Sequence, residues 1–234
     1  MIQNCQIDQT RLEPMMDCME IMDISELADS VPEDEWDWNI ISKRAVVYSC
    51  GIICRDGDVV EHNHHPTEFD LCQRLSQEAA DIMDGIYIKM ADEGDHDFSP
   101  FYIVANSGSS IPEEITEDLI RSAFGGTIHY TARITVEPLD GIVSRVEDNA
   151  DLDYGEDDGD KVYRQSEERY VKAWQALAKW FNETPELQAP VFVSIDERGD
   201  DDDESMVGSV FPRLVLALTK NGSLVGLFSC VVHT

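Results

Sequence analysis

The amino-acid sequence predicts an α+β protein, with a mixed or antiparallel sheet, helices packed on that sheet, and a C-terminal β-hairpin. Apolar residues recur at helical spacing in some segments and at every second position in others, so we expect both helices and strands. The last two apolar runs are separated by Asn221-Gly222, a pair that favours a hairpin turn of type I′. Because the predicted strands end in antiparallel hairpins, this class fits better than a doubly wound parallel sheet.

Residues 1–66 are predicted to form an acidic N-terminal extension with a β-hairpin, and residues 67–234 the main α+β domain. Positions 13–37 contain no Lys or Arg, and their apolar spacing favours an amphipathic helix over positions 14 to about 28. This helix either packs on its own domain or offers its methionines to a partner. The stretch KRAVVYSCGIICRDGDVVEHN then predicts two strands joined by a turn at RDGD.

In the main domain the predicted elements alternate. Helices are expected from Thr67, over PEEITEDLIRSAF with Pro112 in the first turn, and over SEERYVKAWQALAKWF. Strands are expected at PFYIVA, GGTIHYTARITVEP and APVFVSID, and in the closing hairpin at positions 211–219 and 223–233. Two acidic stretches, residues 147–160 and RGDDDDES, carry charge without periodicity and are predicted to be solvated loops.

The net charge limits the partners that this protein can have. The chain carries 48 acidic and 17 basic residues, which gives a formal net charge of -31. Such a field repels nucleic acid, phosphate ligands and anionic membranes at long range, so we expect no direct binding to nucleic acid or membrane. A basic protein partner fits this charge, and so does adaptation to high salt, in which ions screen the self-repulsion.

The first residues and the cysteines predict a cytoplasmic protein. No stretch is long and apolar enough to span a membrane, and MIQNCQIDQTRLEP lacks the basic start and apolar centre of a signal peptide. In a reducing compartment we expect the six cysteines to remain thiols.

Motifs for catalysis or for a cofactor are absent from the sequence. The HNHHP run lies near Cys50, Cys54 and Cys72, but it lacks the paired short spacing of zinc ligands. The stretch ANSGSSIPEE has glycine and hydroxyl groups before a helix but lacks the lysine of a phosphate-binding loop. GxSxG, HExxH and GxGxxG do not occur. We therefore expect a non-enzymatic protein without a cofactor or a metal ion of its own.

Several short stretches, in order, resemble the nuclease A inhibitor family, small α+β proteins that block DNA/RNA non-specific endonucleases of the ββα-metal type. The resemblance begins at DGIYI, residues 84–88, and continues through PFYIVANSGSSIPEEI, ERYVKAWQALAKWF and PVFVSID. It is most specific in the closing hairpin, where T-x-x-G-x-L-x-G-L and the terminal VV-x-T are similar to the last strand of the family. The similarity covers roughly residues 67–234 and leaves residues 1–66 outside.

The resemblance implies which residues contact the nuclease. In this family the C-terminal threonine reaches the catalytic magnesium of the nuclease, and Thr234 stands at the matching position. Its hard oxygen atoms suit Mg²⁺. A carboxylate that follows the first family strand also contacts the nuclease, and Asp92 and Glu93 are both candidates because KMADEGDHDF aligns only with a gap. His233 stands where the family carries a carboxylate, which is a departure from its pattern.

We therefore expect an inhibitor of a basic metal-dependent nuclease, comparable in role to an immunity protein. Thr234, His233, Asp92 and Glu93 are its predicted partner-binding residues, and the acidic surface should speed the encounter. An acidic DNA mimic or anti-defence protein, which fills a basic nucleic-acid-binding groove without using its terminus, is the first alternative. A salt-adapted protein of unrelated function is the second.

Overall fold

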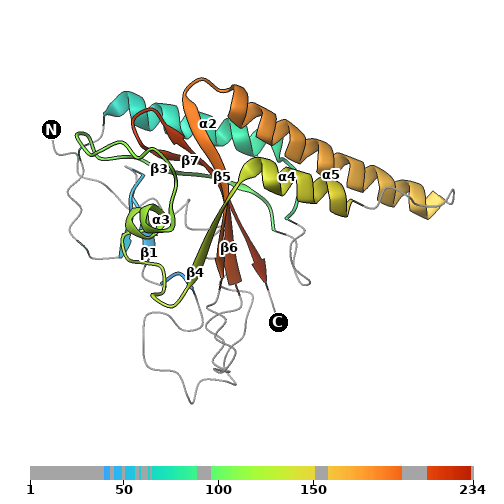
Figure 1. The fold of residues 1–234 in the computed structure, drawn as a ribbon, viewed down its shortest axis with the longest axis horizontal. Helices are drawn as coiled ribbons and strands as arrows, with labels where there is room; N and C mark the ends of the chain where they lie inside the picture. The colour runs from blue at the N-terminus through green and yellow to red at the C-terminus, as the bar shows by residue number, and fades with distance from the viewer. Residues whose placement is uncertain are drawn as a thin grey trace, which may run out of the picture.

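The computed structural model of the protein describes residues 40–42, 45–48, 51–55, 58, 63, 65–88, 96–150, 158–196 and 210–232. Within these ranges the chain forms four helices, a five-stranded sheet and a separate two-stranded ribbon (Figure 1). The five-stranded sheet is antiparallel throughout and its last two strands form a hairpin. The predicted α+β class and closing hairpin are confirmed.

The main sheet has the strand order β3-β7-β6-β5-β4, so the last strand of the chain lies inside the sheet. It pairs with β6 on one side and with β3 on the other. The five strands are β3 (Ser99–Ile103), β4 (Arg133–Pro138), β5 (Leu187–Asp196), β6 (Val210–Thr219) and β7 (Leu224–Val232).

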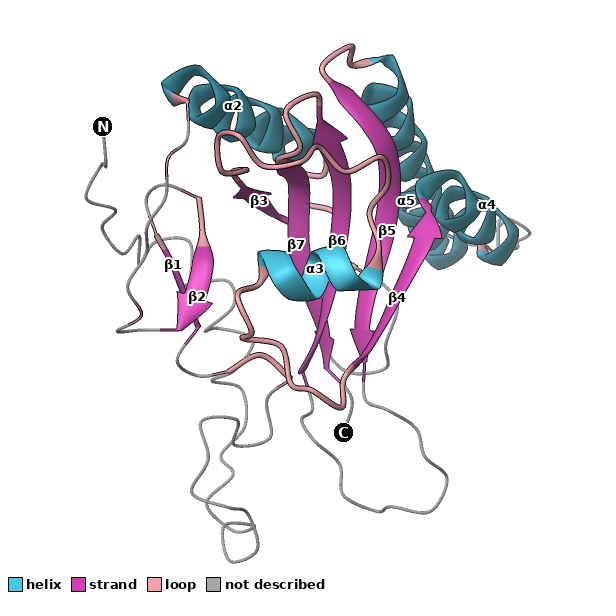
Figure 2. Ribbon diagram, turned by 60° about the vertical axis from the view of Figure 1, so that its left-hand side comes forward, coloured by secondary structure: helices cyan, strands magenta, loops and turns pink. Residues whose placement is uncertain are grey.

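Helices cover both faces of this sheet (Figure 2). One face carries α2 (Pro66–Ile82), α4 (Leu139–Asn149) and α5 (Asp158–Glu183), and the other carries α3 (Glu117–Ala123) and the ribbon of β1 (Ala45–Val47) and β2 (Ile53–Arg55). Trp174 of α5 packs against Phe192 of β5 with ring centroids 6.1 Å apart. On the other face, Phe124 at the end of α3 stacks on Phe101 of β3 at 5.8 Å.

Burial on both faces explains the composition of the closing hairpin. Every described side chain at positions 211–219 and 224–231 is buried, which accounts for the nearly continuous apolar run of both strands. Ile40, Val46 and Ile53 belong to the same hydrophobic core. Part of the segment before residue 66 therefore packs on the main sheet, while the predicted division at residue 66 stays a prediction.

The helices differ from the sequence prediction at three places. Helix α3 begins after Thr116 instead of at Pro112, because the Thr116 hydroxyl accepts a hydrogen bond from the Leu119 N–H at 3.2 Å and caps the helix. Helix α5 already begins at Asp158, inside the stretch predicted to be a loop. Helix α4 is absent from the prediction, although Leu139, Ile142 and Val146 are buried at helical spacing.

Two strand predictions also need correction. The chain reverses between β1 and β2 near Gly51, whose N–H donates to the Tyr48 carbonyl at 2.8 Å. The RDGD stretch begins at Arg55, the last residue of β2, and therefore does not join the two strands. In GGTIHYTARITVEP only the second half forms β4. Ile128 in the first half makes an isolated bridge to Ile41, and Tyr130 is 82% exposed. The tight turn and the bridge both depend on partners that alternation of apolar residues does not reveal.

The closing hairpin has the predicted Asn-Gly turn but a different turn type. Thr219 pairs with Ser223 through its backbone N–H at 2.8 Å, so three residues form the loop. Gly222 has a φ of +87°, whereas the only described non-glycine residue with positive φ is Ala189. Asn221 therefore lacks the conformation that type I′ requires. The loop matches a three-residue connection that ends in a glycine with positive φ.

The long strand and helix predictions agree with the structure in other respects. Helix α2 begins one residue before the predicted Thr67, and β5 contains the predicted APVFVSID stretch. The amphipathic helix predicted at positions 14–28 lies outside the described residues.

Candidate functional site

All four predicted partner-binding residues, Asp92, Glu93, His233 and Thr234, lie outside the described residues. The structure does describe the residues that flank them. Ile88 and His96 are the described residues on either side of the segment that contains Asp92 and Glu93. Val232 is the described residue before His233 and Thr234. The position of these flanking residues decides whether the two segments start from a common surface.

The flanking residues meet on β7. The backbone N–H of Ile88 donates to the carbonyl oxygen of His96 at 3.2 Å, so these two residues lie side by side. The same carbonyl oxygen accepts a hydrogen bond from the Ser229 hydroxyl of β7, also at 3.2 Å. Ser229 lies three residues before Val232. Ile88 and His96, which flank the segment with Asp92 and Glu93, therefore lie near the last part of β7.

This end of the sheet, formed by Asp196, Val210 and Val232, is called the C-terminal edge below. Val210 of β6 pairs with Val232 of β7, and β5 ends at Asp196 next to them (Figure 2). The acidic stretch RGDDDDES leaves the sheet from Asp196 and returns at Val210. Two connections, between Ile88 and His96 and between Asp196 and Val210, and the last two residues of the chain thus start from this end of the sheet.

An ion pair between a buried arginine and a partly exposed aspartate fixes the strands at the C-terminal edge. Arg213 is 7% exposed as a whole residue, and its guanidinium donates to the Asp196 carboxylate at 2.6 Å and to the Pro212 carbonyl at 3.0 Å. Burial lowers the pKa of Arg213 and the charge of Asp196 opposes that shift. Arginine keeps its charge at neutral pH even so. The pair therefore ties the end of β5 to the start of β6 by a charge-assisted hydrogen bond.

A second buried carboxylate fixes the opposite end of the closing hairpin. Glu68 of α2 is 5% exposed, and its oxygen atoms accept hydrogen bonds from the side chains of Thr219 at 2.6 Å, Ser223 at 2.7 Å and Asn221 at 2.6 Å. We call these four residues the hairpin clamp. The clamp satisfies a buried carboxylate with three donors from one turn, so α2 holds the turn between β6 and β7 in place.

Strand β7 also carries a covalent constraint. Cys230 takes part in a disulfide whose second cysteine lies outside the described residues. Cys54 and Cys72 form no disulfide and remain buried thiols. The prediction that every cysteine is a thiol is therefore wrong at Cys230 and confirmed at Cys54 and Cys72. The disulfide adds to the strand pairing that holds the last part of the chain.

The carboxylates at the edge and in the clamp have structural partners. The carboxylates of Glu68 and Asp196 are engaged in hydrogen bonds with neighbouring side chains. Among the described residues, no three His, Cys, Asp or Glu side chains are grouped so as to hold a metal ion. The arrangement stabilises the closing hairpin at both of its ends.

The sequence predictions did not include Glu68, Arg213 or Asp196, the residues that hold the two ends of the closing hairpin. Glu68 stands in the first turn of a helix, where a carboxylate is common because it complements the helix dipole, so nothing marks it as buried. Arg213 gives a clearer signal, because it interrupts the apolar stretch FPRLVLAL and a buried arginine requires a partner. Its partner Asp196 is the last residue of β5, seventeen positions earlier, and nothing in the local sequence marks Asp196 as the partner of a buried arginine.

No protein-family model and no curated protein matches this chain. In the part of the chain that the structure describes, every helix is too short or too polar to cross a lipid bilayer.

Proposed function

We propose that this protein inhibits a basic, metal-dependent nuclease by placing its C-terminal residues in the active site of the nuclease. The observation that carries the proposal is the position of β7. This strand is held by β3 on one side and by β6 on the other, and its last described residue lies at the C-terminal edge. A chain end that leaves a rigid sheet loses less conformational entropy on binding than a disordered tail does.

Chain length supports a common contact surface. Thr234 follows Val232 by two residues, and Glu93 precedes His96 by three. Because an extended chain spans at most about 3.6 Å per residue, Thr234 stays within about 7 Å of Val232 and Glu93 within about 11 Å of His96. His96 is hydrogen-bonded to Ser229 of the same strand. One partner surface can therefore contact both segments.

Each predicted contact residue has a chemical role in this proposal. The hydroxyl or carboxylate oxygen of Thr234 coordinates the magnesium of the nuclease in place of a substrate phosphate, because Mg²⁺ prefers hard oxygen ligands. Asp92 or Glu93 contacts basic residues beside the active site, and His233 fills the space next to Thr234. The metal ion belongs to the partner, so the inhibitor itself needs no cofactor.

The acidic surface contributes mainly to the rate of association. A formal net charge of -31 attracts a protein whose surface is built to hold nucleic acid. Electrostatic attraction of this kind raises the association rate more than it raises the final affinity. The same charge should oppose direct binding of the inhibitor to nucleic acid.

The cytoplasmic location expected from the sequence belongs to this proposal as well. The disulfide at Cys230 counts against the reducing environment assumed for that location, because disulfides persist mainly in oxidising compartments. The inhibition mechanism does not depend on the compartment.

The test is inhibition of a magnesium-dependent, non-specific ββα-metal nuclease by three forms of the protein. These are the intact chain, a chain that lacks Thr234, and a chain that is extended beyond Thr234 by a short tag. We expect the intact chain to inhibit and both altered forms to fail, because the active site accepts only the natural terminus. The same tag placed before Met1 is the matched control and should leave inhibition unchanged.

The other outcomes distinguish the alternatives. Equal inhibition by all three forms, with a steep loss at high salt, would support an acidic DNA mimic, because a mimic needs the charge distribution and not the terminus. Failure of all forms against a panel of ββα-metal nucleases would reject nuclease inhibition.

A further inference from the structure

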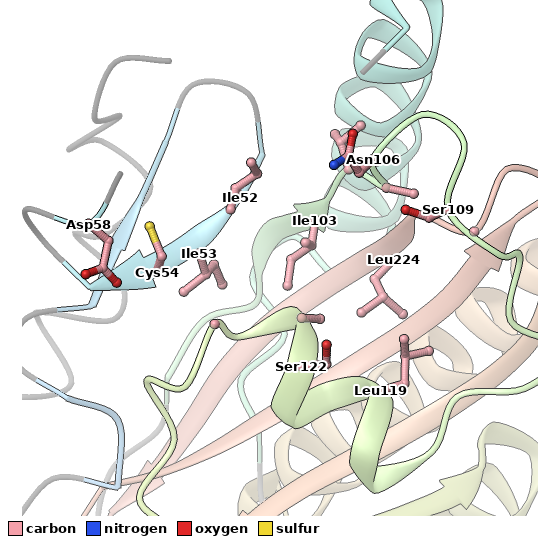
Figure 3. Close-up of a pocket in the computed structure, with 15 residues that line it drawn as sticks. Ile52, Ile53, Cys54, Asp58, Ile103, Asn106, Ser109, Leu119, Ser122 and Leu224 are labelled. Atoms are coloured by element: carbon pink, nitrogen blue, oxygen red, sulfur yellow. The ribbon is translucent and has the colours of Figure 1, made fainter. Parts of the chain in front are cut away.

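A pocket of about 670 Å³ lies far from the C-terminal edge (Figure 3). It opens between the β1–β2 ribbon, the end of β3, helix α3 and the start of β7. Leu224, the first residue of β7, lines the pocket, whereas the C-terminal edge lies at the other end of the same strand. The volume is in the range of pockets that hold small organic molecules.

The lining combines an apolar floor with polar groups at its margin. Ile53, Leu119 and Leu224 extend into the pocket from three different elements (Figure 3). Asp58 lies at one end beside β2, and Asn106 lies at the other end after β3. An apolar cavity with a few polar groups at fixed positions is the usual arrangement of a small-molecule site.

Hydrogen bonds between distant segments hold the walls in place. The Val104 N–H donates to the Gly51 carbonyl at 2.9 Å, which joins β3 to the ribbon. The Ala105 N–H donates to the Ser223 hydroxyl, also at 2.9 Å, and Ser223 belongs to the hairpin clamp. At Gly125, a side chain would collide with the backbone of Ile53, so α3 and β2 approach as closely as the backbone permits. The pocket is therefore formed before any ligand binds.

The charges at the pocket favour a cation. Asp58 is exposed and supplies the one carboxylate among the fifteen lining residues, which include no Lys, Arg or His. Arg121 is the basic residue of the adjacent helix, and it is engaged by the Glu117 carboxylate at 2.9 Å and by the His129 carbonyl at 3.3 Å. An anion in the pocket would be repelled by the Asp58 carboxylate and by the large negative net charge. No positively charged lining residue would offset this repulsion.

We propose that this pocket binds a small organic cation, an amine with an apolar body. Its ammonium group lies beside the Asp58 carboxylate, and its apolar body covers Ile53, Leu119 and Leu224. This site is independent of the proposed nuclease inhibition, because it uses another face of the molecule and does not involve the C-terminus.

The test uses 2-phenylethylamine as the cationic probe and phenylacetate as an anion of similar size, each titrated into the ¹⁵N-labelled full chain. Concentrations up to about 20 mM cover the affinity expected for so small a ligand. We expect saturable amide shifts from the amine at Val104, Leu119 and Leu224, and no saturable shifts from phenylacetate. The Asp58→Asn variant should bind the amine about fivefold more weakly. Because Asp58 is exposed, this variant should fold normally.

Two further variants make the result specific. Asp97→Asn removes an exposed carboxylate elsewhere on the surface and should leave the affinity unchanged. Ser122→Phe adds bulk at an exposed position of α3 that lines the pocket and should abolish the shifts. Binding that is equally strong for phenylacetate, binding that Asp58→Asn does not weaken, shifts spread over the whole acidic surface, or no saturable binding would each overturn the proposal.

Discussion

At the scale of single residues, Glu68 connects α2 to the turn of the closing hairpin. The carboxylate accepts hydrogen bonds from Thr219, Asn221 and Ser223, and it is almost completely buried. When all of its hydrogen bonds are made, a buried carboxylate adds only modestly to the free energy of unfolding. When its donors are removed, the unsatisfied carboxylate lowers that free energy much more. The clamp therefore acts mainly by excluding other conformations of the turn.

Replacing Glu68 with glutamine tests the clamp. Glu68→Gln keeps the size but turns one acceptor into an NH₂ donor that faces donors, so we expect a loss of about 1–3 kcal/mol in the free energy of unfolding. Urea unfolding followed by circular dichroism measures the change. Asp70→Asn, at an exposed position of the same helix, is the control and should shift stability by less than about 0.5 kcal/mol. An equally small effect of both variants would show that the clamp adds nothing to stability.

Arg213 and Asp196 form the corresponding pair at the C-terminal edge, but their side chains differ in exposure. The Arg213 side chain is 8% exposed and that of Asp196 25%. Removing Asp196 leaves a buried charge without a partner, whereas removing Arg213 leaves a carboxylate that water can still reach. The costs of the two substitutions should therefore differ.

We expect Asp196→Asn to lower the free energy of unfolding by about 2–3 kcal/mol, and Arg213→Met to lower it by less. The same urea measurement compares the two variants. If Arg213→Met costs as much as Asp196→Asn or more, the asymmetry in burial does not control the energy of the pair. Neither variant changes Thr234, so a weaker nuclease inhibition by Asp196→Asn would indicate that this pair positions the edge.

At the scale of secondary-structure elements, β7 is constrained in several ways. It has partners on both sides, Glu68 holds the turn before it, and Cys230 adds a disulfide. Gly226 lies in its middle, where an added Cβ atom would collide with the backbone carbonyl of Val215 on β6. Backbone atoms of a paired strand cannot move aside without breaking the ladder. The glycine therefore permits the close approach of β6 and β7.

We expect Gly226→Ala to lower the free energy of unfolding by about 1–3 kcal/mol, because β6 and β7 must move apart to make room for the added methyl group. Thermal unfolding of purified protein measures the effect. Gly141→Ala is the matched control, since Gly141 lies in α4 with open space around it. There the alanine should stabilise by up to about 1 kcal/mol. Equal effects of the two substitutions would contradict the tight packing of β6 on β7.

At the scale of the whole molecule, the net charge affects stability and association in opposite ways. Self-repulsion among the acidic residues destabilises the compact state, and salt reduces that repulsion. Attraction to a basic partner is reduced by the same screening. The closing hairpin itself is held by burial and by the clamp, which salt screens little because these groups are out of water.

We therefore expect that raising NaCl from about 0.05 M to about 0.5 M slows association with an inhibited nuclease about tenfold or more. The dissociation rate should change much less, because the contacts in the complex are short-ranged. Surface plasmon resonance at each salt concentration separates the two rates. An association rate that does not depend on salt would rule out steering by the acidic surface. Unfolding of the isolated protein at the lower salt would instead support salt adaptation.

Local patterns in the sequence determined the longer elements. Helix α2, the second half of α5, strand β5 and the closing hairpin all follow from apolar periodicity and from Asn221-Gly222. These signals work because the periods of helix and strand are properties of neighbouring residues. The predicted contact residues Asp92, Glu93, His233 and Thr234 rest on family resemblance and stay predictions, since they lie outside the described residues.

Tertiary contacts alone decided the strand order, the interior position of β7, the clamp at Glu68 and the pairing of Arg213 with Asp196. Each depends on groups that are far apart in the chain, such as Glu68 and the turn around Asn221. A carboxylate has the same local sequence signal whether it is solvated or buried, and only the packing of α2 against the hairpin removes it from water. The sequence by itself determined which segments form helices and strands, and the three-dimensional packing determined which polar groups hold them together.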